Sequence, residues 1–490
     1  MIGPGSRVIP LPIIILCVLI AMPGVALSVS LEECRISDSA GIHSIAARCG
    51  HVGVPEDHAD PGGDQIDLFV AVVPALTRRP AESALTVIAG GPGAASTEFY
   101  VGYRPAFGRV NRDRDVVLVD QRGTGRSHRL DCQVPEEIGT RDWSVATARD
   151  SAAECLAGLP GDPRFYNTSA AVRDLEAVRL ALGYPALDIY GASYGTRVAS
   201  HYLRRYPDST RSVILDGSLP PDEVLGPRIA LDAQAALEWI FDRCASDDDC
   251  ARSFPDLAAR FATLRAELRQ QMIRVRLPDP TAGDPSSVDL GSLELAAAIR
   301  MLSYRSETAA LIPLLIDSAS RGNPAPLAAQ AQMIVADLGS ALSHGMHNSV
   351  VCSEDVPYFS DLVIDRQALQ ATYMGTDQVD VLEAVCAIWP AGPVDADLRE
   401  PISAEVPVLL ISGEADPVTP PDNGRRFASE LPLARHLVVA GQGHGVAHVG
   451  CMPRLIAEFV DGTDLDALDA ACLDKQGPSP FFLDFSGPGP

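Results

Sequence analysis

The chain has 490 residues, 47% of them apolar, which is enough to bury a large core and argues against wholesale disorder. Its 39 Lys and Arg residues against 64 Asp and Glu residues give a net charge of −25. This balance excludes the basic surface that nucleic-acid binding requires and disfavours anionic membrane surfaces. At roughly 100–200 residues per domain, the length allows several domains, or one large domain with a long insertion.

Residues 1–28 have the pattern of a secretory signal. Arg7 is the only charged side chain among them, and an apolar stretch runs from Val8 to Leu27. Small residues at Ala26 and Ser28 suit a cleavage site. The pattern predicts a protein that is secreted or periplasmic, with an uncleaved N-terminal anchor as the alternative.

Eleven cysteines bear on the redox compartment, and Cys17 lies in the expected signal. The remaining ten, in an exported chain, indicate five disulfides, although spacing does not fix their connectivity. A zinc site is disfavoured because the chain has no CxxC pair and no HExxH motif. The simplest expectation joins sequence neighbours: Cys34–Cys49, Cys132–Cys155, Cys244–Cys250, Cys352–Cys386 and Cys451–Cys472.

Short apolar runs that end at turn residues predict the strands of a sheet. Helical spacing of apolar residues predicts a helix at 169–182. Further helices are expected from the GASYGT segment (191–196) through Arg205, near 423–431 and near 453–459. The alternation of strand and helix favours a mostly parallel sheet with helices on both faces. The expected strands are residues 66–73, 83–89, 115–120, 186–190, 212–216, 406–412 and 435–440.

Near residue 220 the sequence pattern changes from alternating strands and helices to mainly helices. Helical patterns rich in Ala, Leu and Arg dominate residues 228–345, and 278–287 is expected to be a loop. We therefore expect a mainly helical insertion over 220–400. It would interrupt an α/β domain that is built from residues 29–219 and 401–475. The Gly- and Pro-rich residues 476–490 are expected to form a loosely held tail.

The run Gly-Ala-Ser-Tyr-Gly at 191–195 fits G-x-S-x-G, with a predicted strand before it and a helix after it. Such a turn lifts the Ser193 hydroxyl above the sheet and leaves the Tyr194 N–H at a helix N-terminus, where negative charge is stabilised. Gly90 or Gly91, after strand 83–89, would supply a second oxyanion donor, because Pro92 has no N–H. A Gly-rich turn with an accidental Ser is the alternative.

A serine nucleophile needs a base, and in this arrangement the acid and the histidine follow the serine along the chain. Asp416, just past strand 406–412, is the expected acid. His444 is the expected base, because the flanking glycines let its imidazole approach Ser193. Asp416 would fix the tautomer of His444 and stabilise its charged form. The alternatives are Glu414 for the acid, and His448 and His436 for the base.

The segment Asp-Gln-Arg-Gly-Thr-Gly-Arg-Ser at 120–127 has the glycines of a phosphate loop but lacks the Gly-Lys-Ser/Thr ending. We interpret it as a structural turn beside the site. Arg122 is expected to brace this turn by hydrogen bonds.

Taken together, these motifs resemble the α/β-hydrolase peptidases of the prolyl iminopeptidase and tripeptidyl aminopeptidase type, over most of residues 50–460. Ala89 departs from the pattern, because many relatives have His there, but the backbone donors remain. The segments that carry the resemblance are AGGPG (89–93), VLVDQRGTGRS (117–127), GASYGT (191–196), GEADPVTP (413–420) and GQGHG (441–445). Those that resemble the secreted tripeptidyl branch are 54–75, VVCSEDVP (350–357) and VCAIWP (385–390).

The resemblance implies an α/β-hydrolase fold in which the helical insertion caps Ser193. It implies an aminopeptidase that releases tripeptides or single residues from a free N-terminus, with no metal or cofactor. Acidic cap residues would bind the substrate ammonium, and Glu354 and Asp355 are the candidates. Ordinary solvated acids are the alternative for both. We take a monomer as the working assumption.

Two other functions stay open. An esterase or amidase for small non-peptide molecules would use the same triad, and dependence on a free ammonium group would separate the two activities. A non-catalytic binding protein on the same fold would leave Ser193 unreactive toward a fluorophosphonate.

Overall fold

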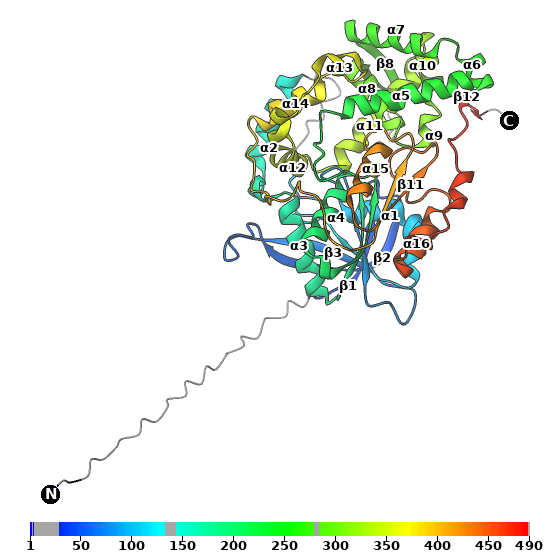
Figure 1. Ribbon diagram of the computed structural model, residues 1–490. Helices are drawn as coiled ribbons and strands as arrows, with labels where there is room; N and C mark the ends of the chain where they lie inside the picture. Colours follow the sequence, from blue (N-terminus) through cyan, green and yellow to red (C-terminus); the bar gives the residue numbers. More distant parts are fainter. Residues whose placement is uncertain (2, 4–28, 133–143, 279–282, 284, 489–490) are drawn as a thin grey trace.

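The computed structural model describes the chain except residues 2, 4–28, 133–143, 279–282, 284 and 489–490 (Figure 1). The expected signal therefore lies almost wholly outside the described residues. Among the helices of the described part, none is both long and apolar enough to cross a membrane.

A nine-stranded sheet, in the order β1-β2-β3-β5-β4-β6-β7-β10-β11, forms the centre of the described chain. The strands from β1 to β5 along this order pair antiparallel, and those from β5 to β11 pair parallel. Every strand expected from the sequence is present. The bounds are Glu32–Ser37 (β1), Ser44–Pro55 (β2), Gln65–Val73 (β3), Ala84–Ile88 (β4), Val116–Val119 (β5), Leu187–Ala192 (β6), Thr210–Asp216 (β7), Val408–Gly413 (β10) and Ala434–Val439 (β11).

Helices cover both faces of the sheet, which confirms the expected fold class. Alternate residues of a central strand enter opposite apolar clusters, as Val213 and Ile214 of β7 do. The buried strands are therefore apolar on both faces, as parallel strands between helix layers require. One face packs against α1 (Ser96–Phe107) and α16 (Met452–Gly462), and the other against α3 (Thr168–Leu182), α4 (Tyr194–Arg205) and α15 (Pro421–Glu430). The helix α2 (Val145–Gly158) packs against α14 (Asp377–Cys386), which lies between β7 and β10 in the sequence.

The insertion between β7 and β10 forms a mainly helical cap on one side of the sheet (Figure 1). Its helices are Ile229–Ser246 (α5), Asp248–Ser253 (α6), Leu257–Gln270 (α7), Ser292–Leu302 (α8), Ser306–Ala309 (α9), Ile312–Ser320 (α10), Ala325–Ala341 (α11), His344–Glu354 (α12), Arg366–Ala371 (α13) and Asp377–Cys386 (α14). Short 3-10 turns lie at Val110–Arg112, Pro163–Phe165, Pro207–Ser209, Val356–Asp361 and Ala471–Lys475.

The expected loop at 278–287 is part of a hairpin instead. Strands β8 (Ile273–Pro278) and β9 (Pro285–Leu290) pair antiparallel, with Val275 opposite Val288. Val275 and Leu290 enter the apolar core of the cap together with α5, α7 and α10. The Pro, Gly and Asp residues therefore mark a turn between two strands. Residues 279–282 and 284 of that turn lie outside the description.

All five expected disulfides are present, each joining the predicted pair. Cys352–Cys386 links α12 to α14 within the cap. Cys451–Cys472 closes a loop around α16. Each bridge lies within one structural unit, and disulfides of this number are typical of proteins from oxidising compartments.

Arg122 braces the 120–127 turn, as the sequence indicated. Its side chain is fully buried and forms hydrogen bonds with Asp174 at 2.6 and 2.7 Å. It also donates to the carbonyl oxygens of Glu56 and Phe165. The planar guanidinium thus joins strand β2, helix α3 and the turn beside the site.

The C-terminal segment differs from the loosely held tail expected over 476–490. Phe481 is 4% exposed and lies in the apolar core of the cap, with the guanidinium of Arg243 over its ring at 3.7 Å. The Ser479 N–H donates to the Ser306 hydroxyl at 2.6 Å, and the Gln442 side chain donates to the Gly477 carbonyl at 2.8 Å. One aromatic side chain overrides the Gly/Pro composition by inserting into the cap. Residues Phe482–Asp484 (β12) and Gly487–Pro488 (β13) then form a small hairpin.

Replacing Phe481 by Ala should lower the free energy of unfolding by about 3–5 kcal/mol, because it removes a buried aromatic side chain. Thermal and urea unfolding of the purified protein measure this loss. The matched control is Phe485→Ala, because Phe485 lies in the same segment and is 61% exposed. The control should change stability by less than about 0.5 kcal/mol. Equal stability of both variants and the wild type would contradict a packed C-terminal segment.

Candidate active site

Ser193 stands on a sharp turn between β6 and α4. Its backbone has φ 54° and ψ −123°, a strained conformation for a residue with a side chain. The turn is tight enough that a Cβ at Gly191 would lie 2.3 Å from the Gly195 carbonyl oxygen, and one at Gly195 would lie 2.4 Å from that of Ile88. These contacts give the physical reason for glycine at both positions of G-x-S-x-G. The geometry is that of a nucleophile elbow.

The candidate oxyanion donors lie next to this turn. Tyr194 is the first residue of α4, so its N–H is at the helix N-terminus. A Cβ at Gly90 would lie 2.8 Å from the Ser193 Cβ and 3.4 Å from the Tyr194 nitrogen. The loop after β4 therefore approaches the serine closely, and the two backbone segments can hold an oxyanion between them. Gly91 follows with a φ of 112°.

His444 and Asp416 form a close pair. The His444 Nδ1 lies 2.8 Å from an oxygen of Asp416, whose side chain is fully buried. Thr419 supports the pair, since its N–H and hydroxyl both donate to Asp416 and its hydroxyl lies 3.2 Å from the same imidazole nitrogen. This arrangement leaves Nε2 of His444 as the nitrogen that can act on a serine hydroxyl.

The charges around His444 raise the pKa of its imidazole, which suits a base. Burial lowers the pKa of its imidazole, but the charge and hydrogen bond of Asp416, with a further contribution from Asp216, outweigh burial, so the pKa lies above its usual value. Arg300 acts in the opposite direction. The Ser193 hydroxyl and His444 are not hydrogen-bonded to each other here, and such contacts often tighten only in the substrate complex.

The alternative acid and bases have other partners. Glu414 accepts the Gly441 N–H at 2.9 Å. His436 lies 3.0 Å from the Ser412 hydroxyl, and burial lowers its pKa to about 4. His448 packs edge-on against Tyr103. Among all the candidate acids and bases, only Asp416 and His444 form a hydrogen bond with each other.

Glu354 and Asp355, the expected ammonium ligands, lie in a buried cluster with Arg197. Arg197 donates to Asp355 at 2.8 and 3.1 Å and to Glu354 at 3.3 Å. Burial raises the pKa of Glu354, although Arg197 and the Thr168 N–H favour its ionised form. The Thr168 hydroxyl lies 2.8 Å from Glu354 and 2.7 Å from the Tyr194 hydroxyl, so the cluster contacts the residue after Ser193. The cluster thus places two acidic side chains against one guanidinium.

The cap contacts the candidate base directly, which the sequence did not reveal. The backbone N–H of His444 donates to the backbone carbonyl oxygen of Tyr304, between α8 and α9, at 2.7 Å. The Tyr304 ring meets the imidazole edge-on, with centroids 5.2 Å apart. Neither Tyr304 nor Thr419 stands out by residue type. Only the position of Thr419, three residues after Asp416, could have indicated its role.

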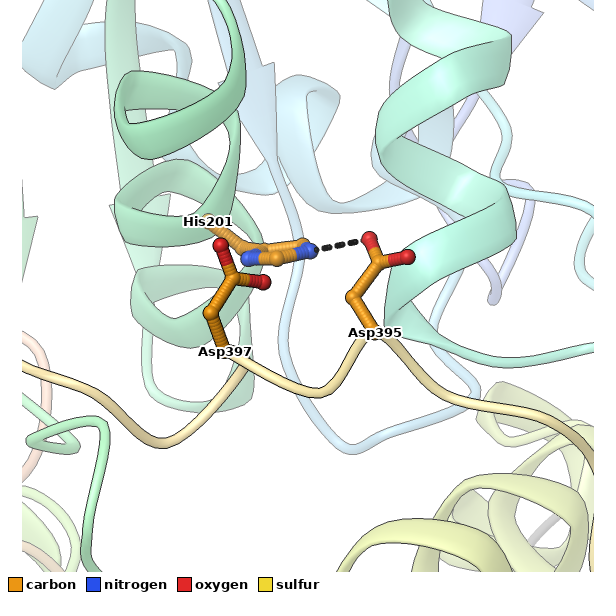
Figure 2. A group of neighbouring side chains, drawn as sticks. All are labelled: His201, Asp395 and Asp397. Carbon is orange, nitrogen blue, oxygen red and sulfur yellow. Dashed lines mark hydrogen bonds and ion pairs between the residues drawn. The ribbon is translucent and has the colours of Figure 1, made fainter.

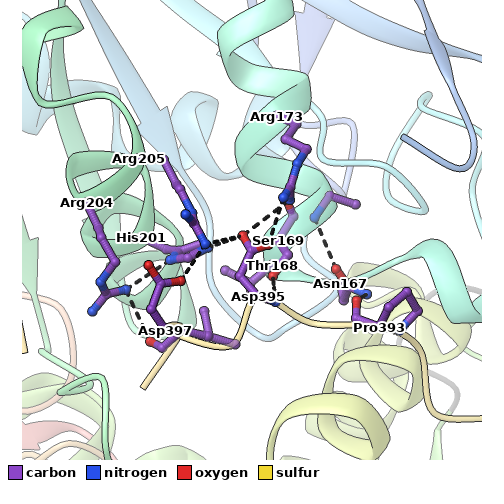
Figure 3. Close-up of polar contacts among 12 residues, drawn as sticks. Asn167, Thr168, Ser169, Arg173, His201, Arg204, Arg205, Pro393, Asp395 and Asp397 are labelled. Atoms are coloured by element: carbon purple, nitrogen blue, oxygen red, sulfur yellow. Dashed lines mark hydrogen bonds and ion pairs between the residues drawn. The ribbon is translucent and has the colours of Figure 1, made fainter. Parts of the chain in front are cut away.

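One group of the described residues has the spacing of metal ligands, namely His201, Asp395 and Asp397, with ligand atoms within 4.8 Å of one another (Figure 2). Arginines already neutralise it, however. Arg173 donates to Asp395 at 2.7 Å, and Arg205 pairs with both aspartates. The cluster holds the chain that leaves the cap against α3 and α4 (Figure 3). We interpret it as a structural clamp.

Hydrolysis of an activated ester should depend on neutral His444. Because its pKa is raised, kcat/KM should increase with pH to a plateau, with a midpoint above 6.5. Asp416→Asn should lower kcat by about 10³–10⁴ and move the midpoint to lower pH, because the imidazolium loses its partner. A stopped-assay pH series measures both.

The control for this series is Asp422→Asn, a change at an exposed aspartate that pairs with Arg425 on the surface of α15. It should retain wild-type kinetics. A folded Asp416→Asn protein with more than a tenth of wild-type activity and an unchanged midpoint would contradict the assignment of the acid.

Comparison with known proteins places this geometry in a family. The profile of the alpha/beta hydrolase fold matches residues 84–450. The chain is 24% identical to the tripeptidyl aminopeptidase of Streptomyces lividans, with 88% of this chain and 85% of that protein covered. It is 26% identical to the serine protease Hip1 of Mycobacterium tuberculosis, with 92% of each covered. It is 28% identical to carboxylesterase B of the same species, with 90% and 89% covered. With Ser193 on its elbow, the protein is a serine hydrolase, and the chain belongs to the α/β-hydrolase fold family.

Proposed function

We propose that this protein is an exported serine aminopeptidase that releases short peptides, tripeptides among them, from free N-termini. Ser193 attacks the carbonyl carbon, and His444 takes its proton and gives it to the leaving amine. Asp416 orients His444. The N–H of Tyr194 and that of Gly90 or Gly91 bind the oxyanion, and water releases the acyl group.

The observation that carries the proposal is the buried acidic cluster beside the elbow. Glu354 and Asp355 share the single guanidinium of Arg197, and the Thr168 hydroxyl links Glu354 to the Tyr194 side chain. An acidic cluster that contacts the residue after the nucleophile suits a substrate that carries an ammonium group near the cleaved bond. Two of the similar proteins named above are called a tripeptidyl aminopeptidase and a serine protease.

Export is part of the proposal. Five disulfides join all ten cysteines outside the expected signal. Such a set persists in the periplasm or outside the cell. The N-terminal pattern around Arg7 supports the same location, and the protein would act there as a monomer without a cofactor.

A second candidate function is an esterase for small molecules, which the similarity to carboxylesterase B favours. The two activities share the attack by Ser193 and differ in their need for a substrate ammonium group.

A matched fluorogenic panel separates the two functions. It contains free and N-acetylated mono-, di- and tripeptide amides, some with Pro at the cleaved bond, and a short-chain ester. We expect cleavage of free N-termini, at least tenfold slower cleavage of the acetylated forms, and loss of both with Ser193→Ala. Ester turnover that is indifferent to acetylation would overturn the aminopeptidase in favour of the esterase. A wild-type Ser193 that resists fluorophosphonate would overturn both.

Glu354→Gln tests the ammonium site. It removes the charge and keeps the shape, so KM for free peptides should increase about tenfold or more, with little change for the ester. The control is Glu176→Gln, since Glu176 pairs with Arg179 on α3 in a mostly buried ion pair outside this cluster. An equal change of KM for the peptide and the ester would show that Glu354 supports the fold alone.

A further inference from the structure

A second buried carboxylate lies at the candidate site, outside the acid–base pair. Asp216 is the last residue of β7 and is fully buried. Its carboxylate accepts the Tyr190 hydroxyl at 2.7 Å and the N–H groups of Val446 and Ala447 at 3.0 Å each. These two N–H groups follow His444 by two and three residues. The carboxylate therefore fixes the backbone on which the candidate base stands.

The backbone of the same residue holds the candidate nucleophile. The carbonyl oxygen of Asp216 accepts the Ser193 N–H at 2.8 Å. The next residue, Gly217, has φ +67°, and a Cβ there would lie 2.9 Å from Cε1 and 3.1 Å from Nδ1 of His444. The end of β7 thus lies between the serine turn and the imidazole and contacts both. A shift of Asp216 would move one of these segments against the other.

We infer that Asp216 is a positioning residue for hydrolysis, which fixes the position of His444 relative to Ser193. The inference rests on the proposed function, because it requires His444 to act as the base for Ser193. The hydrogen bonds of the Asp216 carboxylate go to Tyr190 and to the backbone after His444, so Asp216 acts through His444. In this it differs from Asp416, whose carboxylate contacts the imidazole directly.

The charges around both groups agree with this role. His444 faces Asp416 after β10, Asp216 at the end of β7, and Arg300 from α8. Asp216 is close to His444, to Tyr190 of β6 and to Tyr103 of α1. Burial raises the pKa of Asp216, whereas the Tyr190 hydroxyl, the two N–H groups and His444 favour its ionised form. Because a nearby negative charge favours the imidazolium, its loss should make His444 less basic.

The test measures the rate at which a fluorophosphonate labels Ser193 as a function of pH, together with kcat and KM on an activated ester. In Asp216→Asn we expect kcat to fall at least tenfold with KM nearly unchanged. The midpoint of the pH profile should move down by about half a unit or more. The control is Asp188→Asn, which also removes a buried carboxylate. Asp188 lies near the start of the neighbouring strand β6, at the opposite end of the paired strands from Asp216, and pairs with Arg211. It should leave the midpoint unchanged.

A folded Asp216→Asn protein with the wild-type midpoint would overturn the inference while the proposed function stands. A wild-type protein that is not labelled at all would overturn both. Circular dichroism shows whether each variant folds. If Asp216→Asn does not fold, Tyr190→Phe decides, since it removes only one hydrogen bond to the carboxylate. We expect its kcat to fall severalfold at unchanged KM, and wild-type kcat would overturn the inference.

Discussion

The parallel pairing of β6, β7, β10 and β11 is the constraint on which the candidate site depends. Parallel neighbours end at the same edge of a sheet, so residues that follow them meet there. Ser193 follows β6, Asp216 ends β7, Asp416 follows β10 and His444 follows β11. Four segments from distant parts of the sequence reach one place because adjacent strands share a direction.

The same pairing explains how the chain carries a long cap. The insertion leaves after β7 and returns before β10, yet the two strands remain paired, with Val213 opposite Val408. The sheet therefore remains continuous beneath the cap. Polar contacts then fix the cap on the core. Arg197 of α4 holds Glu354 and Asp355, and the His201 cluster holds the chain that leaves the cap.

Several acidic side chains are buried in this acidic protein. Each is compensated differently. Asp174 has a guanidinium, Asp216 has backbone N–H groups and a phenol, and Asp416 has an imidazole and a threonine. Burying a carboxylate is costly unless donors replace its water, so these contacts account for the negative charge that the core tolerates. The donors come from elements far apart in sequence, so each buried acid also links distant elements of the fold.

The order of acid and histidine along the chain after Ser193 predicted Asp416 and His444 as the acid and base. Local pattern in the sequence determined the strand positions, the elbow at Ser193 and a disulfide set that joins neighbours. Each rests on a short-range rule: apolar runs between turns, small residues in a tight turn, and short loops closed by cysteines. Tertiary structure alone decided the contacts of Tyr304 and Asp216 with the His444 loop, the Arg197 cluster around Glu354, and the insertion of Phe481 into the cap. These contacts join residues tens to hundreds of positions apart, and no local periodicity or spacing records which distant group will lie opposite.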